Sequence, residues 1–288
     1  MPANAFQLKI QPQIQKPAKP FVKWVGGKRR VIPELIRLMP EDFTHYYEPF
    51  IGGGALFFHL RSLNVLQDNQ ITISDMNLRL IRTYRAIRDD VESVIDRLEY
   101  HTERHDKNYF YRVRDVDVDA YTKDVDVAAW FIYLNKTAFN GLYRVNKKNQ
   151  FNAPFGRYKN PNICDTDNLL ACHRALQNVE IVHGCFDQSS KRAKKGDLVY
   201  FDPPYVPVSI TSSFTSYTSN GFGSLEQVIL RDHAQRLKKK GVFVMVSNAE
   251  HDLVRSWYKS FSIRSIQVGR AINCKGGRRG RVGEVIIT

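Results

Sequence analysis

The stretch from residue 45 to residue 75 constrains the fold more than any other part of the chain. An apolar run through His45–Phe50 is followed by three consecutive glycines at 52–54 and then by an apolar segment near 55–63 with helical spacing. A second short apolar run ends at Asp75. Strand, glycine turn, helix and strand in this order predict an α/β sheet whose ligands bind beyond the carboxyl ends of the strands.

Strand patterns return only in the second half of the chain. Short apolar runs occupy Val179–Val182, Leu198–Phe201 and Val242–Val246, and a helical pattern covers 224–239. The stretch 77–163 between the two halves is charged and helical at first and then rich in aromatic residues and Asn, with few strand signals. The simplest organisation is an α/β domain, with helices on both faces of its sheet, that is interrupted by a mostly helical insert.

The charge balance limits the class of partner. Lys and Arg number 43 against 29 Asp and Glu, a formal net charge of +14 that attracts polyanions such as nucleic acid or an anionic membrane. No apolar run approaches the roughly 20 residues that span a bilayer, and no cleavable leader is visible, so we expect an intracellular protein without a membrane. Residues 1–20 carry prolines among Gln and Lys without apolar periodicity, which indicates a mobile basic arm.

The cysteines give no metal signature. Cys164, Cys172, Cys185 and Cys274 form no CxxC pair, and the neighbouring histidines lack zinc-finger spacing. We therefore expect reduced thiols and no metal ion.

The segment Asp202-Pro203-Pro204-Tyr205 is the sharpest chemical signal. It follows directly on the apolar run Leu198–Phe201, so a carboxylate and an aromatic ring emerge together at a strand end. Two consecutive prolines cannot continue a central ladder, and they hold the Asp202 carboxylate and the Pro203 carbonyl as neighbouring acceptors. Two acceptors and a ring face suit an exocyclic amine on a flat base. A proline-rich strand exit with a surface tyrosine is the less favoured alternative.

The glycine turn is a weaker signal. An acidic residue about 20 positions beyond such a turn accepts hydrogen bonds from ribose hydroxyls, and Asp75 stands at the end of the next strand. Capping of the helix that follows is the alternative role for Asp75. Lys28 follows Gly26-Gly27 with the wrong spacing for a triphosphate-binding loop, which argues against a P-loop ATPase.

Together these segments resemble the Dam family of DNA adenine-N6 methyltransferases, of the class alpha type with a DPPY box. Four separated segments carry the resemblance from about residue 21 to 280: Phe21–Lys28, the glycine loop Glu48–Gly54, the box Asp202–Tyr205, and Asn140–Arg144 with Phe151–Tyr158 just beyond it. The resemblance implies a Rossmann-like methyltransferase sheet. It divides the chain into a catalytic S-adenosylmethionine-binding domain, 21–76 and 164–288, and an inserted target-recognition domain, 77–163.

The resemblance also implies roles for individual residues. S-adenosylmethionine is the expected cofactor, without a metal, and is converted to S-adenosylhomocysteine. Its binding residues are expected to be Trp24, Lys28, Phe50, Gly52, Gly54, Asp75, Phe186 and Asp202. Asp202 and the Pro203 carbonyl would accept hydrogen bonds from adenine N6, and Tyr205 would stack on an adenine swung out of the duplex. The DNA-binding surface is expected to comprise Lys23, Asn140, Leu142, Arg144, Pro154, Arg157 and Tyr158.

Arg144 is expected to form a bidentate pair with guanine, and Leu142 to contact a thymine methyl. For Arg157 a phosphate contact is about as plausible as base reading. The implied activity is methylation of adenine N6 in double-stranded DNA, in a GATC or GATC-like site. We expect a monomeric enzyme in the cytoplasm, associated with the nucleoid.

Three alternatives remain open at this point. The amine methylated could belong to RNA or to cytosine. A catalytically silent DNA-binding module would be expected to have a broken DPPY box or glycine loop, and both are intact. A nucleotide-dependent dehydrogenase would need GxGxxG after the first strand, which is absent.

Overall fold

The computed structural model describes residues 16–28, 30–66, 69–206, 222–269 and 281–288. Most of the predicted arm, 1–15, and the basic stretch 275–280 lie outside the described residues. The described end of the arm lies against the body of the protein, because the Lys19 amide donates to Asn168 Oδ1 at 2.9 Å and Asn168 Nδ2 donates back to the Lys19 carbonyl at 3.0 Å.

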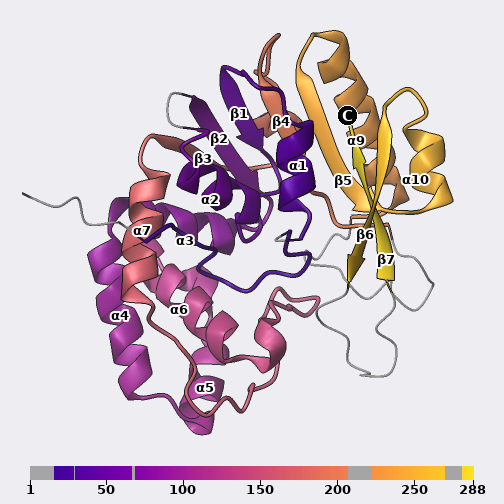
Figure 1. The fold of residues 1–288 in the computed structure, drawn as a ribbon. Helices are drawn as coiled ribbons and strands as arrows, with labels where there is room; N and C mark the ends of the chain where they lie inside the picture. Colours follow the sequence, from indigo (N-terminus) through magenta and orange to yellow (C-terminus); the bar gives the residue numbers. More distant parts are fainter. Residues whose placement is uncertain (1–15, 29, 67–68, 207–221, 270–280) are drawn as a thin grey trace, which may run out of the picture.

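A seven-stranded sheet forms the centre of the described structure, in the order β3-β2-β1-β4-β5-β7-β6 (Figure 1). The strands are β1 (His45–Glu48), β2 (Gln70–Asp75), β3 (Val179–His183), β4 (Leu198–Phe201), β5 (Phe243–Ala249), β6 (Ile263–Gly269) and β7 (Arg281–Ile287). Strands β1 to β5 pair in parallel, while β7 lies antiparallel to both β5 and β6. The predicted α/β fold is confirmed.

The strand order reverses between β1 and β4, which are direct neighbours in the sheet. The chain leaves β1 into the glycine loop and leaves β4 into Asp202. Since parallel strands end at the same edge, these two loops open into one crevice at the switch point. The topology therefore brings together two motifs that lie about 150 residues apart in the sequence.

Helices cover both faces of the sheet. They are α1 (Ile32–Leu38), α2 (Ala55–Ser62), α3 (Leu78–Asp89), α4 (Val91–Glu103), α5 (Lys107–Arg114), α6 (Asp124–Thr137), α7 (Thr166–Leu176), α8 (Phe186–Ser189), α9 (Ser224–Lys239) and α10 (Asp252–Trp257), with short 3₁₀ turns at Val118–Ala120 and Phe139–Gly141. Alternate residues of β4 enter opposite cores: Tyr200 packs with the side of α2, α3 and α6, and Phe201 with the side of α9 and α10. A strand buried on both faces explains why Leu198–Phe201 is uninterruptedly apolar.

The helices α4, α5 and α6 gather at one end of the molecule, below the sheet in Figure 1. Helix α3 begins at the N-cap Asn77, whose side chain accepts from the Leu80 amide, and it packs on β2 and β3 as well as on α6. The core of these helices is thus continuous with one face of the sheet. The division into a catalytic domain and an insert at 77–163 stays a prediction.

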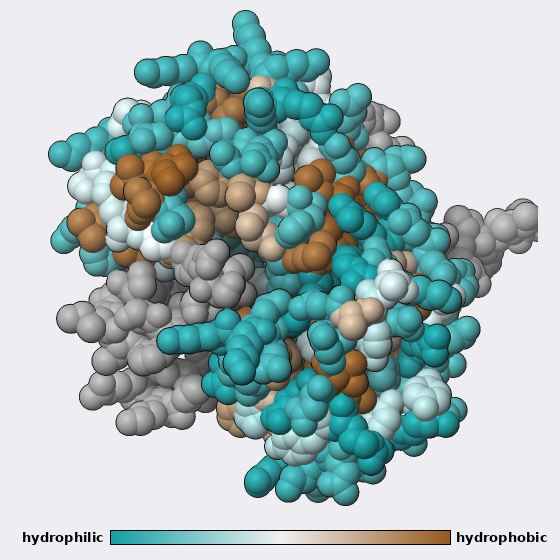
Figure 2. Space-filling view, turned by 180° about the vertical axis from the view of Figure 1, so that it is seen from behind, coloured by the Kyte–Doolittle hydropathy of each residue, from teal (hydrophilic) through white to brown (hydrophobic). Residues whose placement is uncertain are grey.

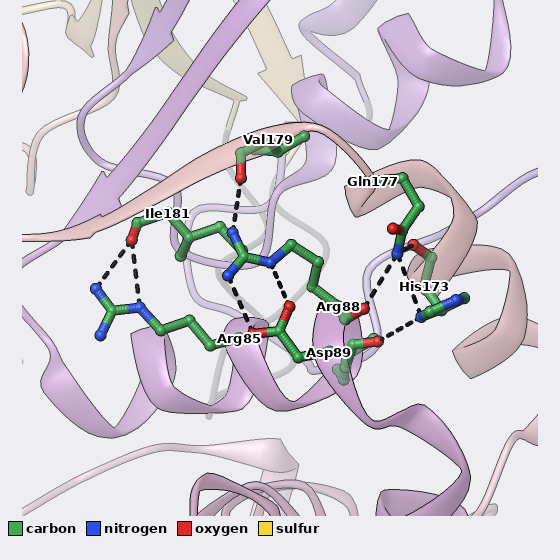
Figure 3. Close-up of polar contacts among 8 residues, drawn as sticks. Arg85, Arg88, Asp89, His173, Gln177, Val179 and Ile181 are labelled. Carbon is green, nitrogen blue, oxygen red and sulfur yellow. Dashed lines mark hydrogen bonds and ion pairs between the residues drawn. The ribbon is translucent and has the colours of Figure 1, made fainter.

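Strand β3 forms one edge of the sheet, and two arginines from α3 bind its carbonyl groups (Figure 3). Arg85 Nη2 donates to the Ile181 carbonyl at 2.9 Å, and Arg88 Nη1 donates to the Val179 carbonyl at 2.8 Å. Asp89 fixes the second guanidinium through Arg88 Nε at 2.7 Å. Exposed strand edges invite pairing with another chain, and side chains bonded along the edge oppose it.

The face in Figure 2 is largely hydrophilic, with its apolar residues in separate patches. Within the described ranges, no helix is long and apolar enough to cross a membrane. The same part of the chain holds no group of three His, Cys, Asp or Glu side chains that could bind a metal ion.

Candidate active site

Lys28 and the DPPY box form the centre of the switch-point crevice. Lys28 is 4% exposed, and its Nζ lies 2.8 Å from Asp202 Oδ1 and 2.6 Å from the Tyr205 hydroxyl, to which it donates. The ammonium also lies over the Tyr205 ring, 4.4 Å from its centroid. One cation therefore fixes the carboxylate and the aromatic ring relative to each other.

Asp202 keeps acceptor capacity in this arrangement. Its Oδ1 atom is buried and ion-paired with Lys28, yet it accepts no aligned hydrogen bond from any described residue. The Pro203 carbonyl likewise accepts none within the described part of the chain. A carboxylate oxygen and a carbonyl oxygen can each accept more than one hydrogen bond, so this pair can accept from a further N–H donor.

Two carboxyl groups in the site differ in their pKa values. Burial raises the pKa of Asp202 to about 6, and the Lys28 cation opposes that rise. Burial raises the pKa of Glu48 further, to about 8, although the Tyr46 hydroxyl donates to it at 2.8 Å. At neutral pH Glu48 is therefore mostly protonated and Asp202 mostly ionised, which leaves the negative charge where the box can use it.

Glu284 is a member of this site that sequence reasoning missed. The Tyr205 hydroxyl donates to Glu284 Oε2 at 2.9 Å, and Glu284 lies on β7, near the end of the chain. It reaches the site because β7 pairs with β5 beside β4. Its position in the sequence carries no motif, so only the strand pairing reveals it.

The glycine loop is held tightly on two sides. The Gly52 amide donates to Asp75 Oδ2 at 3.1 Å, and the Gly52 carbonyl accepts from the Tyr84 hydroxyl at 3.0 Å. Gly52 and Gly54 have φ values of 46° and 70°, which favour glycine. A Cβ at Gly52 would lie 2.6 Å from the Trp24 indole, so Trp24 and the loop require this close approach.

Asp75 has a second backbone partner, because its Oδ1 accepts from the Asn77 amide at 2.9 Å. The helix cap is Asn77 rather than Asp75. Burial raises the pKa of Asp75, and both amide donors oppose that rise. The carboxylate thus stands at the end of β2 beside the glycine loop.

Aromatic rings line the neighbouring wall. Phe50 and Phe186 stack with centroids 5.5 Å apart, and the edge of Phe222 meets Phe50 at the same distance. A close backbone turn, a carboxylate at a strand end and aromatic walls suit a nucleoside with a positively charged substituent. The residues present therefore fit S-adenosylmethionine.

The predicted DNA-binding residues form a second group, on the turns that follow α6 and on the segment before α1 that carries Lys23. Lys23 Nζ lies 4.6 Å from the Tyr158 ring centroid, and the Phe139 amide donates to the Pro154 carbonyl at 2.8 Å. Asn140 is exposed in a left-handed turn with φ 55°. These contacts bring Lys23, Asn140, Pro154 and Tyr158 onto neighbouring turns.

Arg144 is exposed and oriented by one partner. Its Nε donates to Asn152 Oδ1 at 2.7 Å, and its Nη2 donates to the Asn152 carbonyl at 2.9 Å. Arg157 is also exposed, in a left-handed conformation with φ 54°, whereas Leu142 is half-buried against the core. Phe139, 46% exposed beside Asn140, is an apolar surface residue that the sequence analysis did not single out.

A family model described as D12 class N6 adenine-specific DNA methyltransferase matches residues 24–272. The chain belongs to this family. It is thus an adenine-specific DNA methyltransferase that depends on S-adenosylmethionine, and the activity implied by the resemblance to the Dam family is confirmed at that level.

Curated relatives match over nearly their whole length. The Type II methyltransferase M1.LlaDCHI of Lactococcus lactis subsp. cremoris is 45% identical, with 94% of this chain and 95% of the relative covered. The Type II methyltransferase M.MjaIII of Methanocaldococcus jannaschii is 40% identical over 91% of this chain and 95% of its own. The DNA adenine methylase of Salmonella typhi is 31% identical over 94% and 95%.

Proposed function

We propose that this methyltransferase modifies adenine N6 in duplex DNA at a GATC or GATC-like site, using Asp202 and the Pro203 carbonyl to hold the amine. The observation that carries the proposal is the buried Asp202 Oδ1, which has a cation beside it but no aligned donor among the described residues. An exocyclic amine supplies two N–H donors for two such acceptors.

Adenine N6 is a weak nucleophile because its lone pair is delocalised into the ring. Hydrogen bonds from N6–H to Asp202 and the Pro203 carbonyl favour a more tetrahedral nitrogen, and the fixed acceptors orient its lone pair. S-adenosylmethionine supplies a methyl group that its positively charged sulfur already activates. With a pKa of about 6, Asp202 is too weak a base for the neutral amine, so the proton leaves after transfer, when the nitrogen is cationic.

The target base must leave the helix to reach this pocket. Tyr205 offers its ring for stacking on the extruded adenine, which offsets part of an unstacking cost of a few kcal/mol. Lys28 and Glu284 bind its hydroxyl and hold the ring in place.

The cofactor would lie along the glycine loop. Gly52 and Gly54 allow backbone approach, Asp75 faces the ribose hydroxyls, and Trp24, Phe50 and Phe186 form apolar walls. Lys28 and Asp202 would be the cofactor-binding residues next to the reacting amine.

Arg144 is proposed to read guanine. Asn152 occupies its Nε and one Nη2 donor, so the outer edge formed by Nη1 and Nη2 has no partner among the described residues. That edge matches guanine O6 and N7. Asn140, Leu142, Pro154 and Tyr158 would complete the recognition surface, with Lys23 and Arg157 as base or phosphate contacts.

We further propose a monomer that acts on the nucleoid in the cytoplasm. The arginines that close the β3 edge remove one route to strand pairing between copies. From the resemblance to the Dam family, we also propose that residues 77–163 form the target-recognition insert. The catalytic domain would then comprise residues 21–76 and 164–288.

Asp202→Ala tests the proposed amine site. Transfer to a duplex should fall by at least about 1000-fold, since orientation and charge stabilisation are both lost. The dissociation constant for DNA should stay close to wild type, while the unfolding temperature should fall without loss of the fold, because the buried Lys28 ammonium loses its carboxylate partner. Asp232→Ala, at a half-exposed carboxylate on α9, serves as control. Mapping N6-methyladenine in DNA from an expressing host identifies the site, and Asp202→Ala with wild-type turnover would refute the assignment.

Arg144→Ala tests base reading against phosphate contact. If Arg144 reads guanine, discrimination at one base pair should relax by about 1–3 kcal/mol, with little change in the salt dependence of non-specific binding. A phosphate contact would weaken binding evenly on all sequences and lower the salt slope by about one unit. Methylation rates on every single-base variant of the site distinguish the two, and an unchanged rank order and spread would rule out base reading.

A further inference from the structure

Two buried side-chain amides from different elements meet behind the segment that carries Tyr205. Gln227 lies in the first turn of α9 and is 2% exposed, and Asn248 lies on β5 and is 0% exposed. Asn248 Nδ2 donates to Gln227 Oε1 at 3.0 Å. No motif in the sequence marks either residue, and neither is part of the proposed cofactor or DNA contacts.

The free ends of this amide pair hold the backbone on both sides of Tyr205. Gln227 Nε2 donates to the Pro204 carbonyl at 2.7 Å, and Asn248 Oδ1 accepts from the Val206 amide at 3.3 Å. These groups belong to the residue before Tyr205 and the residue after it. The two peptide planes that set the direction of the ring are therefore both bound to one buried pair.

The backbone partners determine how the two side-chain amide groups are oriented. Asn248 must present its oxygen to the amides of Val206 and Ala249, the second at 2.9 Å, so its Nδ2 is the group left for Gln227. Gln227 then accepts through Oε1 and has its own amide hydrogens left for the Pro204 carbonyl. A backbone donor at one end and a backbone acceptor at the other permit only this orientation.

We propose that Gln227 and Asn248 are positioning residues that aim the Tyr205 ring at the target adenine. Because Gln227 occupies the Pro204 carbonyl, the acceptor left for the amine in the box is that of Pro203. Lys28 and Glu284 hold the tip of the Tyr205 ring, while the amide pair holds its backbone. The proposal rests on the stacking role proposed above for Tyr205.

The test is a double-mutant cycle in the full chain, read as the single-turnover rate of methyl transfer to a duplex with S-adenosylmethionine. Gln227→Met keeps the side-chain length but removes both amide functions. It should lower the rate by about 10- to 100-fold, as expected for a misplaced reacting group. In a Tyr205→Ala background the same change should lower the rate by no more than about twofold, because the group it positions is already absent.

Ser247→Ala is the matched control. Ser247 is 1% exposed on the same strand as Asn248, and its hydroxyl pairs with Tyr200 at 2.9 Å without contacting residues 204–206. Its rate should stay close to wild type. A merely structural role for Gln227 would lower the unfolding temperature of the Gln227→Met variant and leave its effect on the rate additive with that of Tyr205→Ala.

Each outcome decides a separate question. If Tyr205→Ala alone leaves the rate unchanged, the role proposed for Tyr205 is wrong, and the positioning proposal falls with it. If Tyr205→Ala is slow but Gln227→Met is as fast as wild type, or the two effects add fully, only the positioning proposal is wrong. If Gln227→Met does not fold, Asn248→Asp decides by the same cycle, because it keeps the acceptor for Val206 and loses the donor to Gln227.

Discussion

Lys28 shows how one side chain sets the chemistry of its neighbour. It is almost fully buried, and its ammonium contacts both Asp202 and Tyr205. Burial raises the pKa of Asp202 from 3.8 to about 6, and the neighbouring cation keeps that rise smaller than burial alone would make it. Lys28 thus helps to keep the carboxylate ionised at neutral pH.

This predicts a pH dependence of methyl transfer. If the ionised Asp202 accepts from N6–H, the single-turnover rate should fall as the pH drops through about 6, because protonation removes an acceptor. Lys28→Met should move this acidic limb to higher pH, since the group that lowers the pKa of Asp202 is gone. Rate profiles between pH 5 and 9 check it, with exposed Lys191→Met as control. An acidic limb that stays in place in Lys28→Met would contradict the assignment.

The residues that sequence reasoning found are those that stand consecutively at strand ends. Asp202 and Tyr205 occur in one short box, and Gly52 and Gly54 in another, so local spacing suffices to recognise them. Glu284, Gln227 and Asn248 were not predicted. They reach the box only through the pairing of β7 with β5 and the packing of α9, which no local pattern encodes.

Among the elements, β4 was the most predictable strand, because it is buried on both faces and therefore reads as a continuous apolar run. The predicted strands at Val179–Val182, Leu198–Phe201 and Val242–Val246 correspond to β3, β4 and β5, with ends that differ by at most three residues. Strands β6 and β7 were not predicted. Charged and small residues interrupt their apolar positions, and their antiparallel pairing joins segments separated by a basic stretch.

The edge strand β3 carries a prediction of its own. Replacing Arg85 and Arg88 together by Ala removes the guanidinium donors from the carbonyls of Ile181 and Val179 (Figure 3). The variant should lose about 1–3 kcal/mol of unfolding free energy and should associate with itself as its concentration rises. Light scattering after size-exclusion chromatography measures the second effect, and Arg104→Ala, an exposed arginine on the far side of α4, is the control. A double variant that remains monomeric at every concentration would show that these arginines do not protect the edge.

At the scale of the whole molecule, the proposed cofactor and DNA surfaces meet at one buried side chain. Asn135 on α6 is 0% exposed and accepts from the Lys23 amide at 2.7 Å. Its Nδ2 donates at 2.9 Å to the Lys23 carbonyl and to the Gly141 carbonyl. Trp24, which touches the glycine loop, stacks on Tyr143 of the recognition segment with centroids 5.9 Å apart. The segment that borders the cofactor loop is therefore bonded directly to the turn that carries Asn140.

When one ligand orders segments that the other ligand also needs ordered, the two bind cooperatively, with a coupling free energy typically of 1–3 kcal/mol. We predict that S-adenosylhomocysteine tightens DNA binding to the wild-type enzyme and that duplex DNA tightens S-adenosylhomocysteine binding by the same factor. Asn135→Ala should bring that factor close to one, because the link between Lys23 and Gly141 is lost. It should also cost about 1–3 kcal/mol of stability, since the two carbonyls and the amide lose their buried partner.

Thr83→Val separates coupling from stability. Its hydroxyl is 0% exposed and donates to the Arg79 carbonyl at 2.8 Å within α3, so its loss affects the same helical region without touching the link. The variant should lose stability and keep the wild-type coupling factor. Titration calorimetry of each ligand in the presence and absence of the other gives that factor for all three proteins. An Asn135→Ala enzyme that is folded and still couples its ligands as strongly as Thr83→Val would place the connection elsewhere, for example in the stacked rings of Trp24 and Tyr143, which also join the two segments.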